Sequence, residues 1–426
     1  MKRRDFIGKV ALGAAAFTII PRHVLGGSEF IAPSDKLNIG FIGTGKQSIG
    51  LMRSIGAIAQ TNLFAAADVD SQKLSYFKDQ AQKVAATKNG APTLQTFSDY
   101  RDMLQLKEID AVVIASPDHW HAMHTIDCAK AGKDIYCEKP LALTIHEGRA
   151  MVDAVRKYDR VLQTGSMQRS QYHFRQAVDL IRNGYLGEIK EVNVSVGVPV
   201  KACDLPSLDT PSYLDWNMWL GPSMYRGYNP TLSPPIENDE WAMWRLYKDF
   251  GGGYITDWGA HMFDIVQWAL DKDNSGPVSF VPPENPLATE GLHYTYADNV
   301  RVNHTSWGTF NAIQFVGSEG KLEVARGMLK PSNPKLIDYK FDKNEKRVQA
   351  VDNHYQNWLD CIKTREKPIC DVEIGHRTSS VCNAVNIAYE LQKPLAWNPQ
   401  TETFNDGSAN LMRGRPYRGS WNYLDF

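Results

Sequence analysis

Lys139 is the residue of this 426-residue chain whose surroundings most clearly suggest chemistry. It follows a short apolar run at residues 134–137, which predicts a buried parallel strand, and it precedes Pro140. A lysine at the carboxyl end of such a strand faces the crevice where open α/β sheets bind ligands. The proline restricts the backbone of Lys139, so its ammonium group is held in place and can stabilise charge on a reacting oxygen. Because Glu138 stands beside it, a plain surface lysine is the competing interpretation.

Asp257 and His261 form a second candidate pair, preceded by three glycines at residues 251–253. Apolar periodicity continues to residue 270 and predicts one helix, on which residues four apart share a face. Such a pair can be an imidazole with its orienting carboxylate, and imidazole accepts protons near pH 7. A helix-surface pair or an N-terminal cap would explain the same spacing. The glycines favour the functional interpretation because they let the helix begin close to another group.

A glycine-rich turn stands between the first predicted strand, residues 36–42, and the helix that follows it. Its sequence is Gly43-Thr44-Gly45-Lys46-Gln47-Ser48. The first glycine permits a tight turn, and the second lets the backbone approach a pyrophosphate at the helix N-terminus. Ser48 occupies the position of a third glycine and is small enough for close packing. The motif alone is a weak signal, so its context must support it.

Asp68 supplies that context. It follows the second predicted strand, residues 62–67, and lies about 20 residues beyond the glycines, where an acid binds the adenosine ribose in dinucleotide folds. It would also repel a 2′-phosphate, which favours NAD over NADP, although Lys73 lies nearby. Asp68 could equally cap the helix expected from residue 71, and the two roles are compatible.

The elements around these motifs alternate between strand and helix as far as residue 165. Further strands are expected near residues 93–96, 111–115, 134–137 and 161–164, and helices near 50–58, 72–86, 100–104, 122–131 and 144–158. Strands separated by helices of this length form parallel βαβ units. Residues 36–165 are therefore predicted to be a dinucleotide-binding domain, with the loops 43–48, 116–121 and 137–140 at one edge of its sheet.

The pattern changes after residue 165. Alternating polarity at residues 188–198 and 306–324 predicts longer strands in an antiparallel sheet. Helices are expected at 354–364 and 376–392, and the Pro and Gly residues spread through 395–426 predict an extended end. Residues 166–426 are thus predicted to form a second, substrate-binding and catalytic α/β domain.

The composition and the first residues restrict where and on what the protein acts. A net charge of -1 gives no electrostatic case for binding nucleic acid. Arg3 and Arg4 precede a short apolar run at residues 10–20, which is the pattern of a twin-arginine export signal. The run is too short to span a membrane, so no stable membrane insertion is expected. We predict that residues 1–35 are signal and linker and that the protein is exported to the periplasm.

Together these motifs resemble those of the Gfo/Idh/MocA oxidoreductases, including their secreted bacterial branch. The resemblance covers nearly the whole chain after the signal. The residues that carry it are Gly43-Thr44-Gly45, Ser116-Pro117-Asp118-His119-Trp120-His121, Glu138-Lys139-Pro140, Trp219-Leu220-Gly221-Pro222 and 251–264. It implies a Rossmann domain joined to an α/β domain with an open, mostly antiparallel sheet, a nicotinamide between the two, and a homo-oligomer.

The resemblance also implies roles for individual residues. Lys139 would contact the reacting hydroxyl, His261 would be the general base, and Asp257 would hold the tautomer of His261. The same three residues are expected to bind substrate, and Arg169, Trp244 and Arg245 are further candidates from their places in the sequence. The expected NAD-binding residues are Gly43, Thr44, Gly45, Lys46, Gln47, Asp68, Ser116, Pro117, His119, His121, Glu138, Lys139 and Gln168.

Plainer structural roles compete for some of these residues. His119 and His121 could instead begin a helix or lie in the core, and Trp244 could be a core aromatic. Gln168 and Arg169 are placed at the cleft only because they follow the sixth strand. No cluster of side chains has metal-ligand spacing, so no metal is expected.

The expected activity is oxidation of a ring hydroxyl of a sugar or glycoside, with hydride transfer to a nicotinamide. Because a periplasm offers little free NAD and the twin-arginine route carries folded proteins, we expect NAD to be exported as a tightly held group. Redox-assisted glycoside hydrolysis, in which bound NAD oxidises the sugar transiently, is the alternative enzymatic function. A non-catalytic sugar-binding protein is a third hypothesis, which the combination of Lys139, Asp257 and His261 disfavours.

Overall fold

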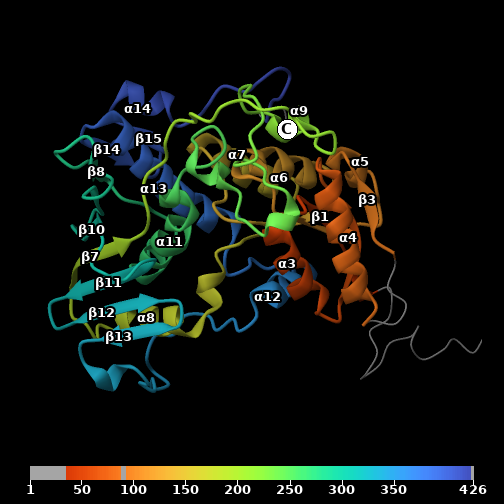
Figure 1. Cartoon of the computed structure of the whole chain (residues 1–426). Coiled ribbons are helices and arrows are strands. Elements are labelled where there is room, and N and C mark those ends of the chain that lie inside the picture. Colours follow the sequence, from red (N-terminus) through yellow and green to blue (C-terminus); the bar gives the residue numbers. More distant parts are fainter. Residues whose placement is uncertain (1–34, 88–92, 424–426) are drawn as a thin grey trace, which may run out of the picture.

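Two sheets with their packed helices form the part of the chain that this computed structural model describes, residues 35–87 and 93–423 (Figure 1). The predicted twin-arginine signal falls on residues 1–34, which lie outside the described residues. Across the described residues, no helix combines the length and the apolar character that crossing a membrane requires.

The first sheet is parallel and, within the described residues, has six strands in the order β3-β2-β1-β4-β5-β6. This is the doubly wound order that binds dinucleotides where the order reverses, between β1 and β4. The central strands are short apolar runs because helices cover both faces of the sheet. The strands are β1 (Leu37–Ile42), β2 (Thr61–Ala67), β3 (Gln95–Phe97), β4 (Ala111–Ile114), β5 (Asp134–Cys137) and β6 (Leu162–Thr164).

Capping residues define where helices of this domain begin. Asp70 accepts hydrogen bonds from the amides of Gln72 and Lys73 at the start of α4, and Thr144 starts α7 with a capping box. The capping residue of α4 is therefore Asp70, which leaves Asp68 to other partners. The helices are α3 (Lys46–Gly56), α4 (Ser71–Ala85), α5 (Tyr100–Leu104), η2 (Asp118–Trp120), α6 (His121–Lys130) and α7 (Ile145–Lys157).

The second sheet has, within the described residues, nine strands in the order β13-β12-β11-β7-β10-β9-β8-β14-β15. Its neighbouring strands are antiparallel except β7 and β10. The predicted fold class, a Rossmann domain plus a mostly antiparallel α/β domain, is confirmed. The strands are β7 (Ile189–Ser195), β8 (Ser279–Val281), β9 (His293–Thr295), β10 (Arg301–His304), β11 (Ala312–Gly317), β12 (Lys321–Ala325), β13 (Met328–Pro331), β14 (Leu395–Asn398) and β15 (Thr403–Phe404).

Three predicted elements of the second domain differ from the structure. The alternating run at 306–324 contains two strands, β11 and β12. The tail predicted as extended contains β14, β15 and helix α14 (Gly407–Leu411). The helix predicted through residue 270 is interrupted at Trp258 into α10 (Tyr254–Asp257) and α11 (Gly259–Ala269). Strands of two to four residues were missed because they carry too little alternation and are stabilised by distant neighbours.

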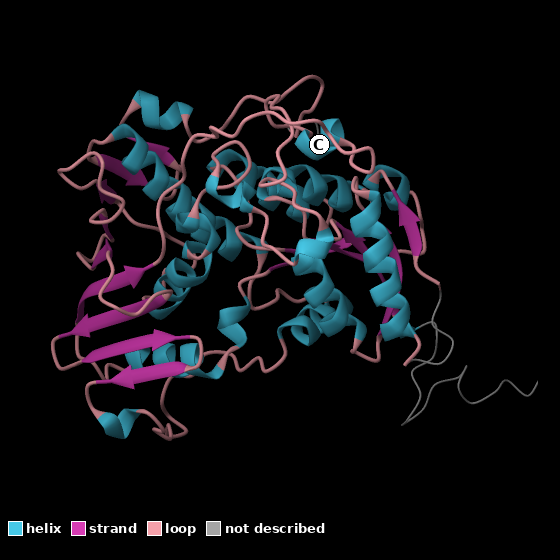
Figure 2. Ribbon diagram, viewed as in Figure 1, coloured by secondary structure: helices cyan, strands magenta, loops and turns pink. Residues whose placement is uncertain are grey.

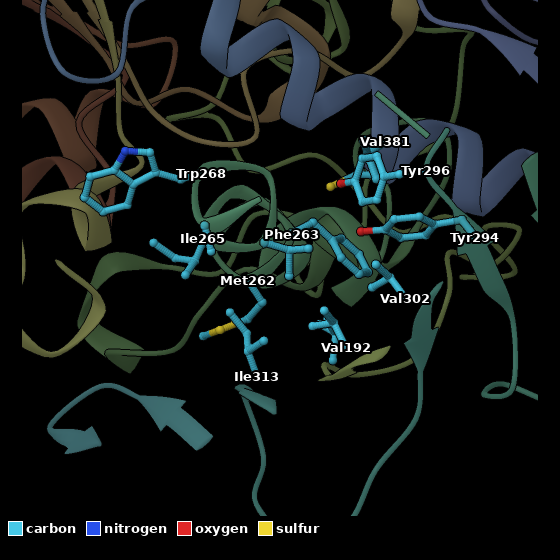
Figure 3. Packing of buried hydrophobic residues seen from close by; sticks show 14 of the residues in the cluster. Val192, Met262, Phe263, Ile265, Trp268, Tyr294, Tyr296, Val302, Ile313 and Val381 are labelled. Carbon is cyan, nitrogen blue, oxygen red and sulfur yellow. The ribbon is translucent and has the colours of Figure 1, made fainter. Parts of the chain in front are cut away.

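Helices α11 and α13 (Val372–Leu391) lie between the second sheet and the first domain (Figure 2). Together with α8 (Tyr172–Arg182), they bury one face of this sheet. Val192 and Val302 belong to this core, and Phe263 of α11 packs against Tyr294 with 5.8 Å between ring centroids (Figure 3). The packing of Phe263 thus fixes the helix that also carries His261.

Helix α12 (His354–Thr364) returns from the second domain to the first. Its Trp358 ring lies 5.6 Å from that of Tyr136 on β5 and is part of the first domain's core. The C-terminal tail returns in the same way, since the Trp421 ring lies 5.0 Å from that of Trp120. Packing therefore crosses the predicted boundary at residue 165 and ties the domains together. The remaining described helices are η3 (Met167–Ser170), α9 (Trp216–Leu220), η4 (Ile236–Asn238), η5 (Met243–Leu246) and η6 (Pro334–Leu336).

Replacing Phe263 with alanine should lower the free energy of unfolding by about 3–5 kcal/mol, because it removes a buried ring and leaves a cavity in the core. Chemical denaturation followed by circular dichroism measures the change. Leu287→Ala is the control: that side chain is 87% exposed, so its truncation should change stability by less than about 0.5 kcal/mol. Equal effects of the two substitutions would contradict this account of the core.

Candidate active site

Lys139 and Asp257 meet where the two domains join. The Lys139 ammonium lies 2.6 Å from Asp257 Oδ1 and 2.8 Å from its backbone oxygen, although the residues are 118 positions apart in the sequence. Burial by itself would raise the pKa of Asp257, but the charges of Lys139 and Arg245 outweigh burial and hold that pKa below its usual value. Asp257 is therefore an ionised carboxylate that fixes the position of the ammonium group.

His261 lies in the first turn of α11, and its imidazole is buried. In the described part of the chain, the Asp257 carboxylate contacts Lys139 and Arg245 and not His261. The group at the imidazole is Arg326, whose Nη2 lies 3.2 Å from His261 Nε2. The prediction that Asp257 holds the His261 tautomer is therefore wrong for this arrangement. An ammonium group attracts a carboxylate more strongly than a neutral imidazole does.

The contact with Arg326 defines the protonation of His261. A guanidinium donates hydrogen bonds and accepts none, so Nε2 is the acceptor and the proton of the neutral imidazole is on Nδ1. Burial, followed by the charges of Lys139 and Arg326, lowers the pKa of His261 well below its ordinary value. Nδ1 is buried and has no hydrogen-bond partner among the described residues. A buried, unpaired N–H is costly, and a substrate oxygen would relieve that cost.

Arg326 is a residue of the candidate site that sequence reasoning missed. It stands in a two-residue turn between β12 and β13, where Gly327 has φ = +72°. Its guanidinium lies 4.7 Å from the ring centroid of Trp258. The Gln168 amide is satisfied when its oxygen accepts from Arg326 Nε at 3.1 Å and its nitrogen donates to the His261 backbone oxygen at 3.3 Å. Gln168, predicted as a cofactor contact, thus positions Arg326. Arg326 and Gly327 come just after the alternating run at residues 306–324, and this turn-forming pair was the sequence signal that could have pointed to Arg326.

A cavity of about 970 Å³ lies beside this cluster, along the carboxyl ends of β1, β2 and β4. Arg245 connects the cavity to this cluster, since it lines the cavity and its Nε lies 3.6 Å from Asp257 Oδ1. Gln47 makes a second link through a 3.0 Å hydrogen bond to Glu138, which precedes Lys139. The predicted site residues that line the cavity are Gly43, Gly45, Lys46, Gln47, Asp68, Ser116, Pro117, Trp244 and Arg245.

The glycine turn is shaped to receive an anionic group. Gly43 has φ = +84°, and a Cβ there would come within 2.8 Å of the Ser116 backbone nitrogen, so only glycine fits. A Cβ on Gly45 would meet nothing within 4 Å, and Gly45 begins α3 without a side-chain cap. The first amides of α3 are thus available at the cavity wall, and a helix N-terminus attracts phosphate groups. These residues fit the pyrophosphate of a dinucleotide.

Asp68 closes the same turn from the end of β2. Its carboxylate accepts hydrogen bonds from the amides of Thr44 at 2.6 Å and Asp70 at 2.9 Å. Thr44, predicted to contact the cofactor, is fully buried and holds Asp68 in place. Burial raises the pKa of Asp68 despite the opposing charge of Lys73, whose ammonium is bound to Asp70 and Ser233. Asp68 lines the cavity where an adenosine ribose would lie.

Residues 232–245 of the second domain, which we call the covering segment, close the cavity from the opposite side. Lys46 of the glycine turn forms a 2.8 Å ion pair with Asp239 and lies 5.1 Å from the ring centroid of Trp241. Trp244 and Arg245 belong to this segment and line the cavity. Sequence reasoning did not place the covering segment, because its own residues do not show which surface it packs against.

Two predicted cofactor contacts, His119 and His121, lie behind the cavity wall. His119 is fully buried, its Nε2 is 3.0 Å from the Trp219 backbone oxygen, and burial lowers its pKa to about 3. Both ring nitrogens of His121 face backbone oxygens, at 3.0 Å for Ser116 and 2.9 Å for Pro140. The two histidines support the loops after β4 and β5, and other residues of the loop after β4 line the cavity.

Arg169, predicted as a substrate contact, is a structural residue. It is 1% exposed, and its guanidinium is bound by Asp264 at 2.8 Å and by Asp273 at 2.7 Å. Its position after β6 suggested that it lies at the cleft. A buried carboxylate requires a buried cation, however, and Arg169 is the cation that pairs with Asp264 in the interior. This correction removes Arg169 from the candidate site.

Asp118 adds a buried carboxyl group that sequence reasoning did not single out. Burial raises its pKa well above the usual value despite the opposing charge of Arg245, which favours the neutral acid. Burial also raises the pKa of Glu138, against the charge of Lys139. Among the described residues, no group of three or more His, Cys, Asp and Glu side chains is arranged to hold a metal ion.

Comparison with known protein families gives two matches. Residues 37–166 match GFO_IDH_MocA, an oxidoreductase family domain described as an NAD-binding Rossmann fold. Residues 180–423 match GFO_IDH_MocA_C2, the C-terminal alpha/beta domain of the same oxidoreductase family.

Curated relatives match over shorter regions. An uncharacterized oxidoreductase, YrbE, of Bacillus subtilis is 32% identical over 148 residues, which cover 35% of this chain and 40% of that protein. A glycosyl hydrolase family 109 protein of Shewanella baltica is 30% identical over 188 residues, 42% of this chain and 40% of that protein. The rhizopine catabolism protein MocA of Rhizobium meliloti is 26% identical over 220 residues, 51% and 56% of the two chains. The chain thus spans about half the length of the curated relatives it matches.

Solved structures share the fold at low sequence identity. An aldose–aldose oxidoreductase from Caulobacter crescentus has a TM-score of 0.58 at 19% identity, covering 85% of this chain and 99% of that one. The WlbA dehydrogenase from Bordetella pertussis, in complex with NADH and UDP-GlcNAcA, has a TM-score of 0.58 at 20% identity, covering 84% and 98%. A levoglucosan dehydrogenase in complex with NADH and levoglucosan has a TM-score of 0.57 at 18% identity, covering 85% and 99%.

Gly45→Ala should separate cofactor binding from folding. The new methyl group would enter open space in the free protein but would crowd a bound pyrophosphate, so NAD affinity should fall about 10- to 100-fold while the melting temperature is unchanged. Calorimetric titration with NAD and thermal denaturation give the two readouts. Gly407→Ala is the matched control, since a Cβ there also meets nothing within 4 Å. Parental NAD affinity in Gly45→Ala would show that the pyrophosphate does not approach this glycine.

Proposed function

This chain belongs to the Gfo/Idh/MocA oxidoreductase family, and on that premise we propose that it oxidises a ring hydroxyl of a sugar or glycoside with NAD. The observation that carries the proposal is the 2.6 Å contact of Lys139 with Asp257 beside the cavity that the glycine turn and Asp68 line. The contact joins one residue from each domain, so it lies where a cofactor bound to the first domain would face a substrate on the second.

Lys139 stabilises the charge that develops on the reacting oxygen. Its ammonium is oriented by the Asp257 carboxylate and backbone oxygen, so the charge needs no rearrangement during the reaction. Lys139 and Asp257 are 16% and 17% exposed, which leaves an opening for a hydroxyl while most water is excluded. The bound nicotinamide would supply the chemistry by accepting hydride from the substrate carbon.

His261 is the proposed general base. Its lowered pKa keeps the imidazole neutral near pH 7, and the Nδ1–H tautomer leaves the lone pair of Nε2 as the proton acceptor. The Arg326 guanidinium donates to that lone pair in the structure. Proton transfer to His261 therefore requires the Arg326 guanidinium to leave Nε2.

NAD is the proposed cofactor form, with NADP less favoured. The Asp68 carboxyl lines the cavity at the ribose end and would crowd a 2′-phosphate. Lys73, the nearby cation that could have attracted such a phosphate, is already bound to Asp70 and Ser233. The proposal extends to a homo-oligomer, as the family resemblance implies.

Redox-assisted glycoside hydrolysis is the second candidate. It is favoured by the relatives named glycosyl hydrolase family 109 proteins, which are 30% identical over 42% of this chain. The two functions differ in their products, since hydrolysis releases the aglycone and leaves the cofactor oxidised, whereas net oxidation leaves it reduced.

Incubating the isolated protein with a panel of sugars and glycosides, and following NADH fluorescence together with aglycone release, tests the function. A sugar that reduces the cofactor is expected, and Lys139→Ala should slow that reduction by about 10²- to 10⁴-fold because it removes the charge beside the reacting oxygen. Lys190→Ala on β7 is the control, since that lysine is 60% exposed. Aglycone release without NADH would establish the hydrolase instead. A Lys139→Ala variant with the parental rate would refute the role of Lys139.

Export with bound NAD to the periplasm is a further part of the proposal, supported by Arg3, Arg4 and the apolar run that follows them. The protein isolated from a periplasmic fraction should carry NAD, measured by absorbance and mass spectrometry after denaturation. Replacing both arginines with lysine should retain the protein in the cytoplasm. Periplasmic protein that is folded but free of NAD would count against a tightly held cofactor.

A further inference from the structure

Arg326 is a cation at the candidate active site that, among the described residues, has no carboxylate within ion-pair distance; the charges of Glu138 and Asp257 act on it only from farther away. Lys139 and Arg245 both act on Asp257. Arg326 instead contacts the imidazole of His261, the amide of Gln168 and the ring of Trp258, none of which carries a negative charge. Within the residues that the structure describes, no carboxylate forms an ion pair with Arg326. Cations placed in this way on a binding surface commonly receive their counter-charge from a ligand.

The Arg326 guanidinium also has donors to spare. Of its five N–H groups, the Nε proton goes to Gln168 and one Nη2 proton goes to His261. The Nη1 protons and the remaining Nη2 proton stay available for a ligand, and the side chain is exposed. Stacking on Trp258 and the bond to Gln168 restrict the plane of the group, so a bound anion would find it already oriented. Such a fork matches two oxygens of a carboxylate or a phosphate.

The contact with His261 couples this anion site to the proposed base. His261 Nε2 cannot accept a proton while Arg326 donates to it. An anion at the free edge of the guanidinium attracts the whole group toward itself, and a charge-assisted hydrogen bond is stronger than one to a neutral imidazole. Binding of an anion would therefore draw Arg326 from Nε2 and leave the base available.

We propose that Arg326 selects sugars that carry an anionic substituent, and that the substituent releases His261 to accept the proton of the reacting hydroxyl. This inference rests on the proposed sugar oxidation, and it names the substrate class: a sugar acid or a sugar phosphate in preference to a neutral sugar. Arg326 is in this account a specificity residue that touches the substrate.

Three sugars with the same ring, a hexose, its hexuronic acid and its 6-phosphate, test the selection. Binding to the NAD-loaded protein is followed by tryptophan fluorescence, which Trp258 should report, and turnover is followed by NADH. The parent protein should bind at least one of the two anionic sugars about 10- to 100-fold more tightly than the hexose. The preferred anion identifies whether the substituent is a carboxylate or a phosphate.

Three variants assign that preference to Arg326. Arg326→Met keeps a side chain over Trp258 but should abolish the preference, and Arg326→Lys should restore part of it. Arg301→Met, the same change at an exposed site on β10, should leave it unaltered.

The pH profile supplies a readout that a purely structural role would not move. The charged or titratable groups that act on His261 are Lys139, Arg326 and His354, and all three lower its pKa in addition to burial. Removing the Arg326 charge removes one of these causes, so the pKa of His261 should rise. Because the base works when deprotonated, kcat/KM is lost as pH falls through that pKa. The acid limb of Arg326→Met should therefore lie at higher pH than that of the parent.

Equal binding of neutral and anionic sugars by the parent, or an unchanged preference in Arg326→Met, would overturn the inference. These outcomes are distinct from failure of the proposed function. Reduction of NAD by sugars without any preference for anions would overturn the inference alone. Preferential binding of an anionic sugar without NAD reduction by any sugar would support the anion site and refute the oxidation.

Discussion

The ion pair of Lys139 with Asp257 is the contact that the arrangement of both domains must bring together. Two charges largely removed from water give up hydration that their attraction only partly returns, so such a pair is weak evidence of stability. The fold must nevertheless hold both residues at this short distance. Gly253, just before α10, has φ = +70°, and a Cβ there would lie 2.5 Å from the Val200 backbone nitrogen. Gly253 thus lets the chain pass close to the backbone at Val200 just before α10 begins.

Interactions far from the cavity hold the two domains at a fixed separation. Arg149 on α7 binds Glu373 on α13 at 2.9 Å and Glu402 at 2.6 Å, so the first domain is joined to the second by charge. In the tail, Arg415 donates to Glu147 at 2.8 Å and to the His119 backbone oxygen at 2.8 Å. These contacts explain why helices and tail of the second part of the chain return to the first. A site shared by two domains needs their separation to be fixed by structure outside it.

Sequence reasoning succeeded where a local pattern has only one physical explanation. Short apolar runs between helices required a covered parallel sheet, and Gly43 required a turn that no other residue adopts. It failed where the partner of a polar group lies elsewhere in the chain. Spacing placed Asp257 and His261 on one face but could not reveal that a lysine and an arginine would compete for them. Arg169 followed a strand end, as a cleft residue would, yet Asp264 holds it in the interior.

The distribution of charge around His261 connects these observations to chemistry. Burial and neighbouring cations lower its pKa, so the imidazole stays neutral beside an ammonium and a guanidinium. Asp257 is the carboxylate whose pKa is held low, while burial favours the neutral acid at Asp118. The site therefore carries three cations, Lys139, Arg245 and Arg326, beside the carboxylates of Asp257 and Glu138, so its positive charge exceeds its negative charge. A surface of this kind is prepared for the charge that appears during reaction, because its own dipoles and cations are oriented before substrate arrives.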